Sequence, residues 1–366
     1  MREMMKAMRM AMMQALFGAM AVTILVFVAT STRGQVRTAA SPPFPIPTVT
    51  PTPVSPAAQI QSKYAAMGGA TGVLGPATSP ISRTADGAGY YQHYQNGSIY
   101  WTAATSVHET HGDIWRKYNS LGGPAALGYP VTDELSAPCG GRYSDFKKGS
   151  LVTSVYWKAG IGAFETHGLI KAKYLEFGGP CALGYPTTDE TATKSDPAGR
   201  YNHFSNGYSI YWKPATGAHE VHGAIRDKYL ALGGPDGFLG FPCTDVTVTG
   251  AWALGRYSNF ENGAIYWTAQ TGAHEVHGAI RERWQALGGV GSWLGYPLTD
   301  ELQVFGFSGY GRYNKFQGGY VYYYPDTDAF ATTDLAGVVY NSLKLKPSLG
   351  TRKVLAILWD PGRPND

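Results

Sequence analysis

Leu127-Gly-Tyr-Pro130 is one of four copies of a tetrad, Leu-Gly-aromatic-Pro, that decides how this chain folds. The other complete copies begin at Leu183, Leu239 and Leu294, and a partial copy, Leu74-Gly-Pro76, lacks the aromatic residue. Successive leucines are 53, 56, 56 and 55 residues apart. A fixed period of this length is typical of repeat architectures, so the sequence predicts an array of five similar units.

A short amphipathic helix is predicted before each tetrad. Ahead of the tetrad at Leu239, Ile225, Tyr229 and Leu232 fall at i, i+4 and i+7, and charged residues occupy the opposite face. The pair Gly233-Gly234 follows at once, which is typical of a helix C-terminus. The other units repeat both features, with Ile60/Tyr64/Met67, Ile114/Tyr118/Leu121, Ile170/Tyr174/Phe177 and Ile280/Trp284/Leu287 before Gly68-Gly69, Gly122-Gly123, Gly178-Gly179 and Gly288-Gly289. An isolated helix of about 10 residues is unstable in water, so each must pack on another element.

A β-hairpin is predicted after each tetrad. In the third unit, Gly199-Arg-Tyr-Asn-His-Phe204 is followed by the turn pair Asn206-Gly207 and by the aromatic segment Ile210-Tyr-Trp212. Two such segments around Asn-Gly are a strong hairpin signal. Matching segments begin at Gly89, Gly141, Gly255 and Gly311. The predicted fold is therefore α+β, with five units of a short helix, a loop and a hairpin, and a short connection to the next helix.

Taken together, these motifs resemble the LGFP-repeat family over about residues 60–330. The resemblance implies an extracytoplasmic module of actinobacterial type that attaches to cell-wall polysaccharide and is often fused to cell-wall enzymes. It also implies that the five units, placed at residues 60–337, close into a pseudo-five-fold, propeller-like ring. For closure, we expect the apolar residues within 335–343 to pack near Ile60 and Tyr64. Residues 338–366 are then either a closing strand or the start of a further domain.

The first sixty residues indicate export. A basic start and an uncharged apolar run make residues 1–40 a signal peptide, with an uncleaved membrane anchor as the alternative. Residues 41–59 are rich in proline and are predicted to be an extended linker. The remainder of the chain is expected to be secreted or associated with the cell envelope, touching the membrane only through an uncleaved N-terminal segment.

Charge and cysteine content narrow the class of partner. The formal net charge is +4, and residues 1–37 account for it, since five Lys or Arg residues there face a single acid. The remaining chain is neutral, which argues against nucleic acid as a partner. The three cysteines, Cys139, Cys181 and Cys243, allow at most one disulfide and have no metal-type spacing.

Adjacent aromatic residues in the hairpins are the first candidate binding groups. Neighbouring residues of a strand point to opposite faces, so one ring of each Tyr-Trp pair is expected in the core, while the other is available to stack on sugar rings. Burial of both rings is the alternative. The candidates are Tyr100, Trp101, Tyr156, Trp157, Tyr211, Trp212, Tyr266 and Trp267, with His108, His219 and His274 as polar neighbours.

Two further motifs invite a metal or catalytic interpretation. His-Glu-x-His-Gly occurs at 108–112, 219–223 and 274–278, but its histidines are three residues apart instead of the four that a zinc-protease helix needs. The favoured interpretation is a structural role, in which His and Glu pair with each other or with exposed backbone at the unit junction. The aspartates of Pro-x-Thr-Asp are expected to stabilise turns, and calcium binding is the weaker alternative. These aspartates are Asp133, Asp189, Asp245 and Asp300.

The sequence thus predicts a non-catalytic module that binds cell-wall polysaccharide, either arabinogalactan or peptidoglycan, and needs no cofactor. No G-x-S-x-G motif, P-loop or dinucleotide fingerprint is present in the chain. Two alternatives stay open. One is an exported hydrolase or metalloenzyme that uses the His-Glu-x-His segments. The other is a protein-interaction scaffold, since repeat surfaces commonly bind proteins.

Overall fold

The computed structural model describes residues 54–250, 255–306, 309–325 and 328–333. The predicted export segment, most of the proline-rich linker and the tail from residue 338 lie outside these ranges. Among the described residues, no helix combines the length and the apolar character that crossing a membrane requires.

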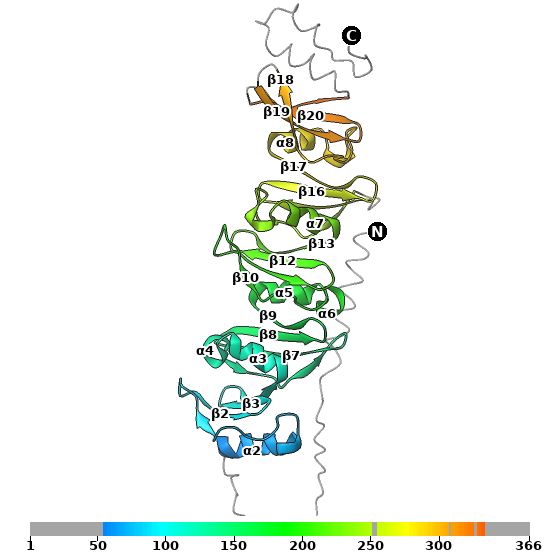
Figure 1. Cartoon of the computed structure of the whole chain (residues 1–366). Coiled ribbons are helices and arrows are strands. Elements are labelled where there is room, and N and C mark those ends of the chain that lie inside the picture. The colour runs from blue at the N-terminus through cyan, green and yellow to red at the C-terminus, as the bar shows by residue number, and fades with distance from the viewer. Residues whose placement is uncertain (1–53, 251–254, 307–308, 326–327, 334–366) are drawn as a thin grey trace, which may run out of the picture. The chain divides into compact units, whose positions relative to one another are not determined.

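Each of the five units consists of short helices followed by an antiparallel sheet whose main strands run in chain order (Figure 1). Unit 1 contains α2 (Pro56–Ala66), η1 (Gly69–Thr71), β1 (Ser82–Arg83), β2 (Gly89–Tyr94), β3 (Gly97–Thr102) and β4 (Ser106–His111). Unit 2 contains α3 (Gly112–Ser120), α4 (Gly123–Leu127), β5 (Tyr129–Pro130), β6 (Leu135–Ala137), β7 (Gly141–Lys148), β8 (Leu151–Lys158) and β9 (Gly162–Thr166). Unit 3 contains α5 (Gly168–Glu176), α6 (Gly179–Ala182), β10 (Thr191–Ala192), β11 (Arg200–Phe204), β12 (Tyr208–Lys213) and β13 (Gly217–His222). Unit 4 contains α7 (Gly223–Ala231), η2 (Gly234–Asp236), β14 (Thr247–Thr249), β15 (Gly255–Phe260), β16 (Gly263–Thr268) and β17 (Gly272–His277). Unit 5 contains α8 (Gly278–Ala286), η3 (Gly289–Gly291), β18 (Leu302–Gly306), β19 (Gly309–Phe316), β20 (Gly319–Tyr323) and β21 (Phe330–Thr332).

The predicted helices are confirmed, and so is the way they end. In α7, Ile225 and Tyr229 of the apolar stripe are buried, and Leu232 is the C-cap residue. The helix ends at Ala231, and Gly233 then adopts the left-handed conformation with φ of 97°. A side chain at that φ is strained, and glycine accepts it without cost, which explains why a glycine stands at this position after α2, α3, α5, α7 and α8.

The predicted hairpin is present but is only the centre of a larger sheet. In unit 3, β11 pairs with β12 around the Asn206-Gly207 turn. The His-Glu-x-His segment, which we predicted to be a connection, forms the fourth strand, with Tyr211 opposite His219. The reason is that the outer edge of β12 would otherwise leave a row of unpaired backbone N–H and C=O groups.

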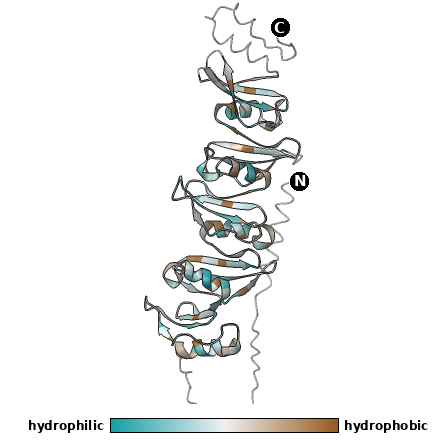
Figure 2. Ribbon diagram, viewed as in Figure 1, coloured by the Kyte–Doolittle hydropathy of each residue, from teal (hydrophilic) through white to brown (hydrophobic). Residues whose placement is uncertain are grey.

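The longer helices α3, α5, α7 and α8 each pack on two sheets, that of their own unit and that of the preceding unit. Thus α5 contacts β12 and β13 of unit 3 and also β8 of unit 2. The apolar cores cross the junctions in the same way, since Tyr156 of unit 2 shares a cluster with Ile170 and Tyr174 of unit 3. Hydrophobic positions accordingly recur along the strands and helices of every unit (Figure 2).

Ring closure stays a prediction at this point. Every strand pairing within the described ranges joins strands of the same unit. The segment expected to close the ring, residues 335–343, lies outside the described part of the chain.

Candidate functional site

The four tyrosines of the Tyr-Trp pairs lie in the core and not on a binding surface. Tyr100, Tyr156, Tyr211 and Tyr266 are all buried. Each makes an edge-on ring contact with the aromatic residue of the next helix, as Tyr211 does with Tyr229 at 5.2 Å between ring centroids. These tyrosines were candidates for sugar stacking, and their burial removes them because both faces of the sheet are covered by helices.

The four tryptophans, Trp101, Trp157, Trp212 and Trp267, are half-buried and face the helix of their own unit. The Nε1 atom of Trp101 donates to Gln59 Oε1 at 3.0 Å. In unit 2, Trp157 Nε1 donates to Asp113 Oδ2 at 2.9 Å. The rings of Trp101 and Trp157 are thus fixed by their polar edges. All four tryptophans keep part of their surface in solvent, so a sugar-contacting role for them stays a prediction.

The histidines proposed as polar neighbours, His108, His219 and His274, belong to the unit junctions. His219 Nε2 donates to the carbonyl oxygen of Thr216 at 2.9 Å. Its Nδ1 atom lies 3.3 Å from Asp245 Oδ1 of the next unit. His274 repeats this arrangement with Asp300 at 3.3 Å, and His108 does so with Asp133 at 3.4 Å.

The four aspartates considered for calcium are each held by an ammonium group. Lys117, Lys173 and Lys228 donate to Asp189, Asp245 and Asp300 at 2.9, 3.0 and 2.7 Å. Lys63 pairs with Asp133 in the same way. In each pair the lysine belongs to the helix of one unit and the aspartate to the next, so these contacts join neighbouring units.

The aspartates also accept backbone hydrogen bonds across the junction. Asp245 Oδ1 accepts from the Glu220 amide at 3.0 Å. Burial by itself would raise the pKa of Asp245, but His219, the Glu220 amide and Lys173 together lower it to about 2. Among the described residues, no group of three or more His, Cys, Asp or Glu side chains is arranged to hold a metal ion.

The glutamate that precedes the last histidine of each motif completes the junction, and it is kept in unit 2, where the segment reads Phe164-Glu-Thr-His167. Buried Glu165 accepts from the amide of Glu190 in the next unit at 3.0 Å. Its other oxygen lies 2.9 Å from His167 Nδ1, and His167 Nε2 lies 3.2 Å from Glu190 Oε1. The predicted pairing of His and Glu at the unit junction is therefore confirmed.

These groups have perturbed acidities because they are enclosed together. The hydrogen bond to Glu165 raises the pKa of His167 against the effect of burial. Burial raises the pKa of Glu190 to about 7. The third junction differs, since Val246 takes the place of the second glutamate and donates its amide to Glu220 Oε1 at 3.0 Å.

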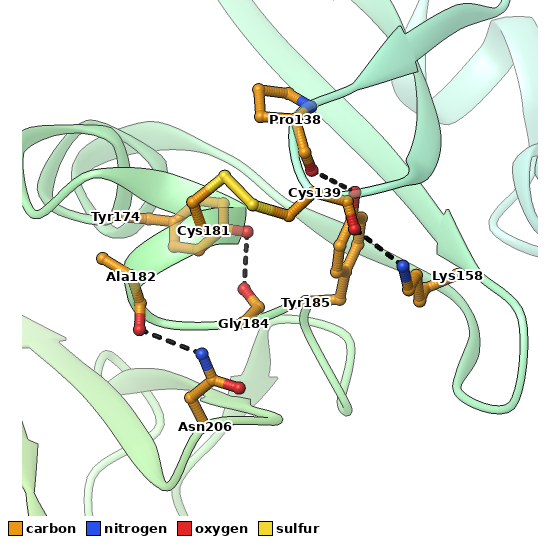
Figure 3. Close-up of a disulfide and its surroundings, with 9 residues drawn as sticks. All are labelled: Pro138, Cys139, Lys158, Tyr174, Cys181, Ala182, Gly184, Tyr185 and Asn206. Carbon is orange, nitrogen blue, oxygen red and sulfur yellow. Dashed lines mark hydrogen bonds between the residues drawn. A yellow bond between two sulfur atoms is a disulfide. The ribbon is translucent and has the colours of Figure 1, made fainter.

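The role of the tetrad aromatic was not predicted from the sequence. Tyr185 inserts beside Gly141 of the preceding unit, where a Cβ atom would lie closer than 3.0 Å to the ring. Its hydroxyl donates to the carbonyl oxygen of Pro138 at 2.6 Å (Figure 3). We refer to this glycine and the turn before it as the socket. Phe241 and Tyr296 occupy the sockets at Gly199 and Gly255 in the same way.

A disulfide reinforces one of these junctions. Cys139, in the turn of the unit 2 socket, is bonded to Cys181 in α6 of unit 3 (Figure 3). Three cysteines allow one disulfide, and this pair forms it. Cys243 is a free, exposed thiol. At the following junction a hydrogen bond joins the corresponding loops, since the Ser195 amide donates to Asp236 Oδ1 at 2.7 Å.

Two exposed aromatic residues were also missed. Phe238 and Trp293 immediately precede the tetrad leucine in units 4 and 5, and their exposed fractions are 46% and 50%. The Asn262 side chain donates to the carbonyl oxygen of Phe238 at 2.9 Å and so fixes this loop. The sequence signal was a large aromatic residue where units 2 and 3 have Ala126 and Ala182.

These contacts define a tandem-repeat protein, because each α+β unit completes its core only with its neighbour. The model of the LGFP repeat matches five consecutive segments, residues 74–125, 127–180, 183–237, 239–292 and 294–345. The chain therefore belongs to the LGFP-repeat family, whose members carry this tandem-repeat module. This family places the start of a repeat at the tetrad instead of the helix. No curated protein matched the chain.

Proposed function

We propose that this protein is a non-catalytic module that binds cell-wall polysaccharide outside the cytoplasm. The observation that carries the proposal is the pair of exposed aromatic rings at one repeated position, Phe238 and Trp293. A flat apolar ring in solvent, held on a fixed loop, suits the apolar face of a sugar.

The surroundings of Phe238 support a sugar rather than a purely apolar ligand. The ring of His277 lies 4.9 Å from that of Phe238, between centroids. His277 Nδ1 lies 2.7 Å from Glu275 Oε2 and its Nε2 lies 3.4 Å from Glu301 Oε2, so the Phe238 ring lies beside a polar imidazole–carboxylate cluster. The neutral charge of the chain after residue 37 fits an uncharged glycan better than a polyanion.

The disulfide supports a place outside the cytoplasm. Bonds such as Cys139–Cys181 persist in oxidising compartments and are rare in the reducing cytoplasm. This agrees with the export signal expected in residues 1–40.

Repetition suits binding better than catalysis. A polymer that engages two sites on one chain binds the second at a high effective concentration, so weak single contacts add up to firm attachment. Phe238 and Trp293 are at corresponding positions of successive units, as a polysaccharide with repeated residues would require.

The test is a sedimentation assay of the full chain with insoluble actinobacterial cell wall, before and after removal of arabinogalactan. The double variant Phe238→Ala/Trp293→Ala is expected to lose at least tenfold in affinity. Leu169→Ala is the matched control, because Leu169 is an apolar side chain with a similar exposed fraction of 57% that belongs to helix α5 and not to the loop before a tetrad.

Three results would count against the proposal. The first is a wild-type chain that does not sediment with either wall preparation. The second is an equal loss of affinity in the control. The third is binding that free arabinan, galactan and peptidoglycan fragments fail to compete, which would indicate a protein partner and favour the scaffold alternative.

A further inference from the structure

Every junction between units is made of two unlike halves. The later unit supplies its tetrad aromatic residue and the aspartate that follows it, as Tyr185 and Asp189 do in unit 3. The earlier unit supplies the socket, a helix lysine and the glutamate of its last strand, as Gly141, Lys117 and Glu165 do in unit 2. A further junction, including one that closes a ring, needs a free socket in unit 5 and an aromatic residue in unit 1.

The socket of unit 5 is filled by the unit itself. A Cβ atom on Gly311 would lie closer than 3.0 Å to the ring of Tyr324, the relation that Gly141 has to Tyr185. Tyr324 is only 4% exposed. Its place in the sequence corresponds to Lys158 of unit 2, whose ammonium lies 5.5 Å from the ring of the incoming Tyr185.

The fourth strand of unit 5 has also lost the residues that receive a following unit. In unit 4, Tyr266 and Ile265 lie opposite His274 and Glu275. In unit 5 the corresponding residues, Tyr322 and Val321, lie opposite Phe330 and Ala331. No carboxylate is therefore present at the position where Glu275 accepts from the amide of Glu301.

Unit 1 lacks the complementary groups at the other end of the array. Ala77 bridges to Tyr94 as Pro186 bridges to Phe204, which places Pro76 where unit 3 has its tetrad aromatic residue. The His93 amide donates to Ser79 as the His203 amide does to Thr188. The next two residues of unit 1 are Pro80 and Ile81, where unit 3 has Asp189 and Glu190.

We infer that the array is open and that unit 1 and unit 5 are its two terminal units. Unit 5 fills its own socket with Tyr324, and unit 1 offers a proline where the aromatic residue would be. Neither ring closure nor head-to-tail joining of two copies can then use the contacts that connect the inner units. This inference replaces the ring that the family resemblance implies, and it does not depend on the proposed function.

Pulsed electron-electron distance measurement on the spin-labelled full chain tests the inference. Labels at Ala103→Cys and Asp328→Cys report the distance from unit 1 to unit 5, in a Cys243→Ser background that keeps the native disulfide. The reference pair, Ala103→Cys and Ala159→Cys, occupies exposed turns of the adjacent units 1 and 2.

In a closed ring, units 1 and 5 are neighbours, as units 1 and 2 are. The distance from unit 1 to unit 5 would then be similar to the reference distance from unit 1 to unit 2. A main distance from unit 1 to unit 5 that exceeds the reference distance supports the open array. An equal or shorter distance overturns it.

A second measurement tests Tyr324 at the residue level. Gly311→Ala should lower the urea midpoint of the wild-type chain and leave that of Tyr324→Ala nearly unchanged, because the added methyl group then meets no ring. The same decrease in both backgrounds would show that Tyr324 does not fill the socket.

Discussion

Gly141→Ala tests whether the tetrad aromatic residue holds neighbouring units together. Gly141 has no left-handed φ, so alanine brings no backbone strain at this position. Its methyl group would lie closer than 3.0 Å to three atoms of Tyr185, well inside the 3.4–4 Å of ordinary van der Waals contact. The ring must therefore move out of the socket, or the strand must shift.

The expected cost has two parts. Overpacking a well-filled site costs about 1–3 kcal/mol. Displacement of the ring also breaks the hydrogen bond from the Tyr185 hydroxyl to Pro138, which contributes about 1 kcal/mol. We therefore expect Gly141→Ala to lower the free energy of unfolding by about 2–4 kcal/mol.

Urea unfolding of the full chain, followed by tryptophan fluorescence, measures this cost. Gly291→Ala is the control, since a Cβ atom there meets no neighbour within 4 Å, and it should stay within about 0.5 kcal/mol of the wild type. In a Tyr185→Ala background, Gly141→Ala should cost less than about 1 kcal/mol, because the colliding ring is gone. If Gly141→Ala lowered the free energy of unfolding equally in that background, the insertion of the Tyr185 ring into the socket would be refuted.

Three further changes probe the same junctions. Removing the Cys139–Cys181 bond by reduction should destabilise units 2 and 3 by about 4 kcal/mol in the chain-entropy model, given the separation of 42 residues, and urea midpoints with and without reductant will measure it. The folded-state pKa of Glu190 is about 7, above the ordinary value of 4.5, so its stabilising effect is complete below pH 4.5 and is lost as the pH rises through about 7. The raised pKa of His167 acts with the same sign, and Glu190→Gln should flatten the fall in unfolding free energy between pH 5 and pH 8. Asp245 has a folded-state pKa of about 2, below the ordinary 3.8, so its contribution is present above pH 3.8 and is lost as the pH falls through about 2. Asp245→Asn should therefore cost about 1–3 kcal/mol at pH 7 and much less at pH 2, which unfolding curves at the two pH values will show.

Contacts close in sequence were predictable. The helix stripe of Ile225 and Tyr229, the glycine pair after it and the Asn206-Gly207 turn are all read within about ten residues. The role of the tetrad aromatic residue was not predictable in this way, because Tyr185 meets Pro138, 47 residues earlier. A periodic sequence shows that units repeat, and it does not show which surface of one meets which surface of the next.

The candidate binding residues illustrate the same limit. Strand alternation correctly predicted that Tyr100 and Trp101 point to opposite faces of the sheet, but it could not show which face is covered by a helix. Both faces are covered, since Trp101 meets Gln59 of its own helix and Tyr100 meets Tyr118 of the next. Phe238 and Trp293 were missed because they lie in a loop, where hydrophobic periodicity carries no information.

Because each junction has two unlike halves, it also governs where a gene of this kind can gain or lose repeat units. An inner unit such as unit 3 carries both halves, with Phe241 of unit 4 against its own Gly199 and its own Tyr185 against Gly141. Copying or deleting it between tetrads leaves every remaining junction complete. Adding a copy beyond Tyr324, or ahead of Pro76, would instead leave two surfaces that do not match. Changes in length are therefore confined to the interior, and the two terminal units stay in place while the number of copies between them varies.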